Sequence, residues 1–300
     1  MRDRLSRSGV NPRQGLGSPS TSEQTRLNIE RWSAGEHVDV YANRSLAPVE
    51  VLILVRYRQA LSGRVIEVGC GAGRVLGYLE RLGRDVYGVD VSPAMVNYCR
   101  RAYPGTDVRV GDIRALEGVV QGPFDAIFAA NNLLDVFDDA ERRSVLRGFH
   151  RLLAPDGLLI FSSHNLADAD RHDTSAEHPP PQRHAVALLA KVIDKPPAEV
   201  VRRVAALPRR IRNRRRLAPL EHRADDYALI NDETLDYSLL HYYIRRDDQA
   251  RQLSEVGYEL MECLGPDGSP VAPGDTGHGP WLHYIARPVS LPVRRPVHVR

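Results

Sequence analysis

Two periods of apolar and polar positions alternate along the chain between residues 64 and 162. Short, nearly continuous apolar runs predict buried strands, and between them apolar residues recur every three or four positions, as in helices packed on one side. Buried strands that alternate with helices are typical of a doubly wound α/β fold with a mainly parallel sheet. The predicted strands are Arg64–Val68, Asp85–Val89, Val108–Val110, Phe124–Ala129 and Leu158–Ser162, and the predicted helices are Ala47–Leu61, Gly73–Leu82, Pro93–Ala102 and Asp138–Leu153.

The alternation stops at His164. The polar, proline-containing stretch 165–183 predicts a loop, and residues 184–216 predict helical pieces broken at Pro196 and Pro208. Elements with clear periods then return toward the C-terminus. They are a strand at Leu235–Ile244, a helix at Gln249–Glu255, and two final strands at Tyr258–Leu264 and Trp281–Ala286.

We therefore expect a seven-stranded sheet with an α+β insertion after its fifth strand. Insertions at that edge of such a sheet usually cover the ligand crevice. Segments without apolar periodicity at the two ends are expected to be disordered. The expected parts are a leader at 1–20, one domain formed by 21–164 and 246–287, an inserted substrate cap at 165–245, and a tail at 288–300.

Composition narrows the class of protein. Apolar residues make up 42% and charged residues 26% of the 300 positions, and the net charge of +3 is too small to indicate a nucleic-acid partner. No apolar run approaches the roughly 20 residues of a membrane span, and the N-terminus lacks a secretory signal, so we expect a cytoplasmic protein. The wide spacing of Cys70, Cys99 and Cys263 excludes a disulfide framework and a cysteine-rich zinc site, and we expect no metal.

The main chemical signal is the glycine-rich turn Gly69–Gly73, which has a glycine at every second position after a predicted strand. Asp90 ends the next strand, where a carboxylate can accept hydrogen bonds from both hydroxyls of a ribose. Arg74 stands where the dinucleotide fingerprint has its third glycine, and Glu67 would oppose a pyrophosphate but attract an ammonium group. The turn therefore favours a cofactor that carries an amino acid over a nicotinamide dinucleotide.

With these residues the chain resembles the class I S-adenosylmethionine (SAM)-dependent methyltransferases. The run E-V-G-C-G-A-G at Glu67–Gly73 is similar to the first motif of that family, and Asp90 is similar to its ribose-binding acid. The resemblance covers about residues 40–165 and, more loosely, 246–287. Further similar segments are Gly111–Ile113, whose acid would meet the adenine amino group, Phe124–Ile127 in the fourth strand, and the turn Leu152–Gly157, with Asp156 in place of a glycine.

The resemblance implies an active methyltransferase with SAM as cofactor and S-adenosylhomocysteine (SAH) as product. Strand-end aspartates such as Asp112 also cap helices, and a helix methionine such as Met95 also fills cores. By position, the resemblance implies that the methionine part of SAM is met by Glu67, Gly69, Gly71 and Gly73, and that the ribose is bound by Asp90. It implies that Met95 and Asp112 lie near the adenine and that Asn131 lies near the methyl donor. The cofactor set is completed by Cys70, Val91 and Ile113.

Candidate acceptor residues follow the fourth and fifth strands, where the crevice opens. Methyl transfer mainly needs alignment, and a base is needed only when the nucleophile is protonated. An unperturbed histidine titrates near neutrality, which makes His164 a candidate base, although a solvated or helix-capping role fits both His164 and Asp135. The tyrosines of the insertion fit the core of the cap as well as a substrate wall. The expected catalytic residues are His164 and Asp135, and the expected substrate contacts are Asn132, Tyr227, His241 and Tyr242.

The segment Arg202–Arg216 contains eight arginines and no acidic residue. It could hold phosphates, or it could be a solvated helix face in a chain whose only lysines are Lys191 and Lys195. Asn131–Leu134 replaces the N-P-P-Y-type motif of nucleobase enzymes, which favours a small-molecule acceptor such as a sugar or specialised metabolite.

The acceptor atom stays open between oxygen, nitrogen and carbon, and the oligomeric state between monomer and homodimer. The other functions considered are an RNA or nucleotide methyltransferase that uses the arginines, a non-catalytic SAM-binding regulator, and a nicotinamide oxidoreductase. We expect no membrane partner.

Overall fold

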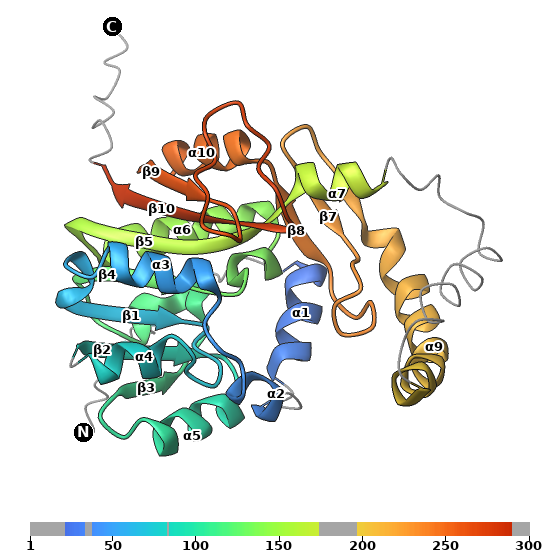
Figure 1. Cartoon of the computed structure of the whole chain (residues 1–300), viewed down its shortest axis with the longest axis horizontal. Coiled ribbons are helices and arrows are strands. Elements are labelled where there is room, and N and C mark those ends of the chain that lie inside the picture. The colour runs from blue at the N-terminus through green and yellow to red at the C-terminus, as the bar shows by residue number, and fades with distance from the viewer. Residues whose placement is uncertain (1–21, 34–37, 83, 174–196, 290–300) are drawn as a thin grey trace, which may run out of the picture.

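The computed structural model describes residues 22–33, 38–82, 84–173 and 197–289. Within them ten strands form one sheet with helices on both faces, so the predicted α/β class is confirmed (Figure 1). The expected leader at 1–20, the expected break at Pro196 and most of the expected tail lie outside the described residues.

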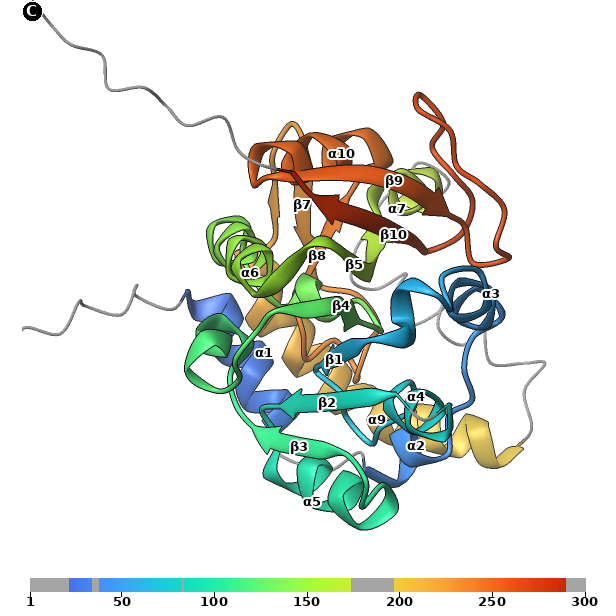
Figure 2. The ribbon, with the colours of Figure 1, turned by 90° about the vertical axis from the view of Figure 1, so that its left-hand side faces the viewer.

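The first five strands run parallel to one another. Their order in the sheet is β3-β2-β1-β4-β5, so the winding changes direction between β1 and β4, and Figure 2 shows this order directly. Such a switch point opens a crevice at the carboxyl ends of the two strands. The bounds are β1 (Arg64–Val68), β2 (Asp85–Asp90), β3 (Asp107–Val110), β4 (Phe124–Ala129) and β5 (Leu153–Asn165).

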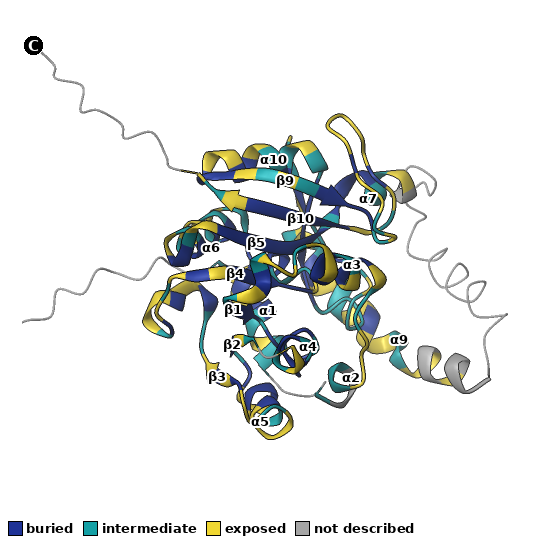
Figure 3. Cartoon of the chain, turned by 60° about the vertical axis from the view of Figure 1, so that its left-hand side comes forward, coloured by how far each residue is buried: buried dark blue, intermediate teal, exposed yellow. Residues whose placement is uncertain are grey.

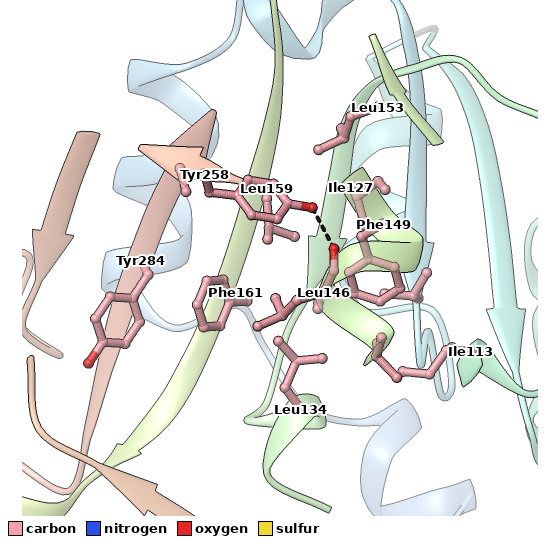
Figure 4. Packing of buried hydrophobic residues seen from close by; sticks show 14 of the residues in the cluster. Ile113, Ile127, Leu134, Leu146, Phe149, Leu153, Leu159, Phe161, Tyr258 and Tyr284 are labelled. Carbon is pink, nitrogen blue, oxygen red and sulfur yellow. Dashed lines mark hydrogen bonds between the residues drawn. The ribbon is translucent and has the colours of Figure 1, made fainter. Parts of the chain in front are cut away.

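Alternate strand residues enter two apolar clusters, because successive side chains point to opposite faces of a sheet. On β1, Ile66 belongs to the first cluster and Val65 to the second. The first cluster includes Tyr258, whose hydroxyl donates to the Leu146 carbonyl oxygen at 2.9 Å (Figure 4). Figure 3 shows mostly buried strands between helices with exposed outer faces. The helices are α3 (Pro48–Arg56), α4 (Leu76–Arg81), α5 (Pro93–Ala102), α6 (Asp139–Leu152) and α10 (Arg246–Glu255).

Local signals explain where several of these helices begin. Asp138 caps α6, because its side chain accepts a hydrogen bond from the Glu141 amide at 2.8 Å. Helix α4 begins at Leu76 rather than at the expected Gly73, because Gly73 has φ +82°, a left-handed conformation that a helix excludes. Helix α3 ends earlier than expected and is followed by the 3-10 turn η1 (Ala60–Ser62).

The insertion adds three strands to the sheet, which therefore has ten described strands instead of the expected seven. On β5, His164 pairs with Trp281 along one edge and with Tyr243 along the other. The edge of β5 that pairs with β8 is the same edge that pairs with β4 nearer the start of β5. Strand β8 therefore lies in line with β4, beyond its carboxyl end. The added strands are β6 (His222–Arg223), β7 (Tyr227–Ile230) and β8 (His241–Ile244), and the remaining two are β9 (Tyr258–Leu264) and β10 (Trp281–Pro288).

Two helices of the insertion differ from expectation. The start of the predicted loop is a helix, α7 (Leu166–Asp173), since the Asn165 side chain accepts a hydrogen bond from the Ala167 amide at 3.1 Å and so caps it. Helix α9 (Pro197–Leu217) continues through Pro208, where we expected a break. Pro208 is exposed, so water can bond the carbonyl that a proline leaves unpaired.

The predicted strand Leu235–Ile244 begins only at His241. Leu235, Asp236 and Tyr237 all have positive φ values and form a turn instead of extended backbone. The strand β7, which pairs antiparallel with β8, was not predicted.

The N-terminal helices α1 (Glu23–Ser33) and α2 (Val38–Ala42) lie at the carboxyl end of the parallel strands (Figure 1). On α1, the Asn28 side chain donates to the carbonyl oxygens of Val136 at 2.9 Å and Leu240 at 2.7 Å. Helix α1 thus joins the segment after β4 to the segment before β8. None of the described helices combines the length and the apolar character needed to cross a membrane.

Candidate active site

A cavity of about 540 Å³ lies at the carboxyl ends of the parallel strands, and the insertion contributes to its wall. Four predicted site residues, Gly73, Asp135, Tyr227 and Tyr242, do not line it. The others meet there. These lining residues are Glu67, Gly69, Cys70, Gly71, Asp90, Val91, Met95, Asp112, Ile113, Asn131, Asn132, His164 and His241.

The glycine-rich turn forms an open cradle in this cavity. Gly69 and Gly71 have φ values of +61° and +52°, which L side chains rarely adopt. A Cβ at Gly71 would meet nothing within 4 Å, so its backbone stands open for a ligand. Gly73 has a different role, since a Cβ there would come within 2.5 Å of the Tyr103 ring. Its glycine permits close packing of the turn against the neighbouring residues.

Glu67 is a buried carboxyl group beside this cradle. The Leu76 amide donates to its Oε2 at 2.7 Å, which ties Glu67 to the start of α4. Burial raises the pKa of Glu67 to about 8, although the Leu76 amide and the charge of Arg74 favour the ionised form. Arg74 itself pairs with Glu50 through two hydrogen bonds. A ligand ammonium would therefore find a carboxyl group without a directly bonded cation.

Asp90 is held by backbone amides and still has acceptor capacity. Its Oδ2 accepts from the Gly71 amide and its Oδ1 from the Ser92 amide, both at 2.8 Å. Burial raises the pKa of Asp90, and these two bonds oppose the rise. Each carboxylate oxygen can accept a second hydrogen bond, so a ribose diol fits here. The open glycine cradle, Glu67 and Asp90 together fit the cofactor that the sequence resemblance implies.

Asp112 faces the cavity but is also engaged by Arg114. Arg114 donates to both carboxylate oxygens, at 3.1 Å and 2.6 Å. Burial opposes ionisation of Asp112, but the bonds and the charge of Arg114 outweigh it and hold its pKa below the usual value. Asp112 can accept a further hydrogen bond only alongside this pair.

The segment after β4 carries backbone strain. Asn131 and Asn132 both have φ +56°, in the left-handed region that is uncommon for residues other than glycine. The Asn132 amide donates to Ser162 Oγ at 2.9 Å, and its side-chain Nδ2 lies 3.3 Å from His164 Nε2. Its side-chain oxygen is buried without a partner among the described residues. Such strain concentrates at functional sites.

Asp135 sets the orientation and tautomer of His164. Asp135 Oδ2 lies 2.7 Å from His164 Nδ1 and also accepts from the His164 backbone amide at 2.7 Å. An ionised carboxylate only accepts hydrogen bonds, so Nδ1 carries the ring proton and Nε2 keeps a lone pair. Asn132 Nδ2, a donor, lies beside that nitrogen. Position and tautomer therefore suit His164 to accept a proton.

A fully buried arginine keeps Asp135 ionised. Arg142 of α6 donates to Asp135 Oδ1 at 2.5 Å, and the Ser163 hydroxyl donates to the same oxygen at 2.7 Å. Burial opposes ionisation of Asp135, but Arg142, His164 and Ser163 outweigh it and hold its pKa below the usual value. Arg142 also donates to the side-chain oxygens of Gln249 at 2.7 Å and Gln252 at 3.2 Å, so its charge is well bonded.

A second histidine–aspartate pair adjoins the first. His241 Nδ1 lies 2.7 Å from Asp232 Oδ2, which also accepts from the Tyr243 hydroxyl at 2.9 Å. The rings of His164 and His241 stack with centroids 4.8 Å apart and planes at 20°. Ligand atoms of His164, Asp232 and His241 lie within 4.8 Å of one another. Two of these three groups are already bonded to each other, His241 Nδ1 to Asp232 Oδ2, and the third stacks on them through the His164 ring.

Tyr227 and Tyr242 lie outside the cavity wall. Their rings stack on each other with centroids 4.8 Å apart. The Tyr242 hydroxyl donates to Asp139 at 2.7 Å, and the Arg142 guanidinium lies over its ring at 4.6 Å. These contacts support α6 and the buried arginine rather than a bound acceptor.

Several lining residues were missed from the sequence, above all on β10. In the pairing of β10 with β5, Trp281 is opposite His164 and His283 is opposite Ser162. Their alternation, with a large or polar side chain at every second position, is the available signal. Burial lowers the pKa of His283 to about 4, with a small opposing effect of Glu50. His283 is therefore neutral at pH 7. The other missed lining residues include Glu50, Arg74, Ser162 and Thr234.

Comparisons with known proteins agree with this geometry. A family model described as a methyltransferase domain matches residues 65–157. The ubiquinone biosynthesis O-methyltransferase of Xanthomonas oryzae pv. oryzae is 31% identical over 169 residues, which are 54% of this chain and 68% of that protein. The protein of the same name from Xanthomonas campestris pv. campestris is 34% identical over 130 residues, 42% of this chain and 53% of that protein.

Solved structures show the same fold at low identity. The CcbJ methyltransferase from Streptomyces caelestis has a TM-score of 0.53 and 15% identity, with 86% of this chain and 98% of that chain covered. A TehB-like SAM-dependent methyltransferase from Corynebacterium glutamicum has a TM-score of 0.50 and 16% identity, with 88% and 99% covered.

Proposed function

Because the chain belongs to the family of class I SAM-dependent methyltransferases, with SAM as its methyl donor, we propose that it methylates a hydroxyl oxygen of a small molecule with His164 as base. The observation that carries the proposal is the bonded pair of Asp135 and His164, which puts the ring proton of the neutral imidazole on Nδ1 and leaves the Nε2 lone pair, beside Asn132 Nδ2, as the proton acceptor of a ring that lines the cavity.

The cofactor half of the cavity would be built as follows. The amides and open backbone of the glycine-rich turn would lie against the methionine part, and Glu67 would meet its ammonium group. Asp90 would hold the ribose hydroxyls, with Val91 beside it. Met95, Asp112 and Ile113 would surround the adenine, with Cys70 and Asn131 completing the wall. When bound, SAM supplies an electrophilic methyl carbon on a sulfonium.

The acceptor half would prepare the nucleophile. A hydroxyl placed against His164 Nε2 would give its proton to that nitrogen, and its oxygen would take the methyl group that SAM supplies, with SAH as the leaving group. Asp135 then stabilises the imidazolium across the 2.7 Å contact with Nδ1. General-base assistance of this kind contributes about 10²–10⁴-fold in rate.

A small acceptor fits the dimensions of the site. The cavity has about 540 Å³ for both cofactor and acceptor, and its wall includes Thr234 and His241 from the insertion. The expected cap at 165–245 would thus contribute to acceptor selection. The O-methyltransferase names of the Xanthomonas relatives support a hydroxyl acceptor.

The test combines methyl transfer with cofactor binding. Labelled SAM is incubated with a fractionated extract, and label is counted in small-molecule, RNA and protein fractions. We expect label in the small-molecule fraction, a loss of about 10²–10⁴-fold with His164→Ala, and unchanged SAH affinity by calorimetry. His278→Ala changes an exposed histidine away from the cavity and is the matched control. Label confined to RNA or protein, or full activity of His164→Ala, would contradict the proposal.

A further inference from the structure

The turn Leu235–Tyr237 is strained and lies next to the acceptor half of the cavity. Its three residues have φ values of +47°, +61° and +60°, and none is glycine. Left-handed conformations cost L residues roughly 1–2 kcal/mol each, so three in succession persist only when surrounding contacts hold them. The turn therefore needs a clamp, and the contacts around it identify one.

Arginines of α9 provide that clamp. The guanidinium groups of Arg210 and Arg214 lie 5.1 Å and 5.2 Å from the centroid of the Tyr237 ring. Arg210 is only 8% exposed and also lies 3.7 Å from Asp236 Oδ1. Arg209 pairs with Asp236 as well. A buried arginine engaged in this way is part of the protein interior rather than a surface charge.

The backbone of the turn is bonded from both sides. Asn213 of α9 donates from Nδ2 to the Asp236 carbonyl oxygen at 2.9 Å. From the other side, Asn231 Nδ2 donates to the carbonyl oxygens of Tyr237 at 2.9 Å and Leu239 at 2.6 Å. The loop from Asn231 to Leu239 is therefore closed on itself and fastened to α9.

The same loop carries residues of the acceptor half. Asp232 binds His241 Nδ1 at 2.7 Å, and its Oδ1 accepts from the Thr234 amide at 2.8 Å. Thr234 and His241 line the cavity, and the His241 ring stacks on His164. A shift of the turn would move Asp232 and release the ring of His241, the neighbour of the proposed base.

We propose that Arg210 and Arg214 are positioning residues of the acceptor site, which act through the clamped turn and Asp232 to fix His241 beside His164. This rests on the proposed methyl transfer, because it assumes that the acceptor binds against the two histidines. It also gives the arginine-rich segment a role within the protein. In the described part of α9, Arg212, Arg215 and Arg216 are exposed, whereas Arg210 and Arg214 face the turn.

The electrostatic surroundings of His241 supply a direct readout. The titratable groups that face it are Asp232, Tyr243, His164 and Asp135. Burial lowers the pKa of His241, but the charge and hydrogen bond of Asp232 outweigh this, so the net shift is upward. If the clamp is lost and Asp232 moves away, burial is opposed only by the charge of Asp135, the least of the raising causes, and the pKa of His241 falls.

The experiment compares Arg210→Ala/Arg214→Ala with the control Arg212→Ala/Arg215→Ala. The His241 ring nitrogens are titrated by NMR in the SAH complex of the full chain, and kcat, acceptor KM and SAH affinity are measured. We expect the pKa of His241 to fall by roughly one unit and acceptor KM to rise about 10-fold in the first variant. SAH affinity should stay within about twofold in both variants, and the control should match the wild type.

A second pair of variants keeps the test decisive if removal of buried Arg210 impairs folding. Arg214→Gln changes the partly exposed partner alone and should show the same shifts at smaller size. Leu235→Gly removes strain at φ +47° and should restore acceptor KM partly in the arginine variants. An unchanged His241 pKa and KM in the clamp variants, or equal losses in the control, would overturn the proposal.

The outcomes separate this proposal from the proposed function. The titration of His241 needs no acceptor, so it tests the clamp even if the wild-type protein methylates nothing in the extract. If the pKa of His241 falls as expected in the clamp variants but the wild-type protein transfers no methyl group, only the proposed hydroxyl methylation is contradicted. Transfer that is strong and fully independent of Arg210 and Arg214 would contradict the clamp alone.

Discussion

The two halves of the cavity are held in place by different means. Apart from Asn131, the proposed cofactor half comes from one continuous stretch, Glu67 to Ile113, and its geometry rests on backbone: left-handed glycines and two amides that bond Asp90. The acceptor half joins residues 132, 164, 241 and 281, and side chains hold it, chiefly Asp135 and Asp232. A local backbone motif can be conserved as a unit, whereas an assembly of distant side chains depends on each supporting contact.

This difference leads to a separable response to mutation. Changes in the supporting side chains should reduce turnover and leave cofactor binding intact. Changes in the cradle should reduce cofactor affinity and leave the acceptor chemistry intact once cofactor saturates the site. Each prediction below tests that separation.

The largest effect is expected from Asp135→Asn. The substitution leaves the buried charge of Arg142 without its carboxylate, and removing one partner of a buried pair costs about 3–5 kcal/mol of unfolding free energy. It also replaces one carboxylate oxygen by an NH2 group, which can face His164 Nδ1 and favour the other tautomer, so kcat should fall about 10²–10⁴-fold. Urea unfolding, steady-state kinetics and SAH calorimetry measure the three quantities.

The pH dependence of this variant has a defined sign. The pKa of Asp135 is depressed in the folded protein, so its contribution to stability is present above the ordinary carboxyl pKa. The stability difference from the wild type should therefore shrink as the pH falls below about 4. Asp156→Asn, at an exposed position, is the control and should change neither quantity. A weakened SAH affinity in folded Asp135→Asn would break the separation of the two halves.

A smaller effect is expected from Asp90→Asn, and it should fall on cofactor binding rather than on turnover. The amide loses the charge that strengthens hydrogen bonds from the ribose, and such bonds are worth about 1.5–3 kcal/mol. SAH should bind about 10- to 100-fold more weakly. At saturating SAM, kcat and acceptor KM should stay within about threefold of the wild type. An equal fall in kcat at saturation would show that the cradle and the base are coupled.

The smallest effect is expected from Glu67→Gln. In the wild type the folded pKa of about 8 exceeds the ordinary 4.5, so the native state binds more protons than the unfolded state between these values. Unfolding free energy should therefore fall as the pH rises from 6 to 8, by about 2 kcal/mol from this group, and Glu67→Gln should lack that component.

Cofactor binding should also be linked to the protonation of Glu67. An ammonium beside Glu67 favours its ionised form, so SAH binding at pH 7 should release up to about one proton from the wild type. Calorimetry in buffers of different ionisation enthalpy measures this number, and it should approach zero in Glu67→Gln. Equal proton release by both proteins would place the ammonium away from Glu67.

The contrast between the two halves of the cavity also explains which features of the fold and of the site could be predicted from the sequence. The strands, the glycine turn and Asp90 follow from periods and motifs within a few residues of one another, and these predictions of fold were confirmed. His164 and Asp135 were selected because they follow predicted strands, and His241 as part of the polar and aromatic set of the insertion, but their contacts with one another depend on the whole fold. Tyr227 and Tyr242 were selected from the same set of the insertion and lie outside the cavity.

The remaining differences between the predicted and the observed structure have physical causes that composition does not reveal. The positive φ values of Leu235–Tyr237 interrupt a stretch whose apolar pattern resembles a strand. Asn165 caps a helix inside a polar stretch, and Pro208 is accepted within one at an exposed position. The buried position of Arg210 could not be read from a run in which arginines look alike. The turn and Arg210 depend on contacts between distant segments, whereas the Asn165 cap is set by neighbouring residues.

The chain contains two tryptophans, Trp32 and Trp281, and both line the cavity. Trp32 lies 5.7 Å from the ring of Tyr41, another lining residue, which is close enough for efficient energy transfer. The indole emission of this protein is therefore an intrinsic gauge of cavity occupancy. Ligand libraries can be screened against unlabelled protein by fluorescence, because a ligand that packs against either indole changes the emission.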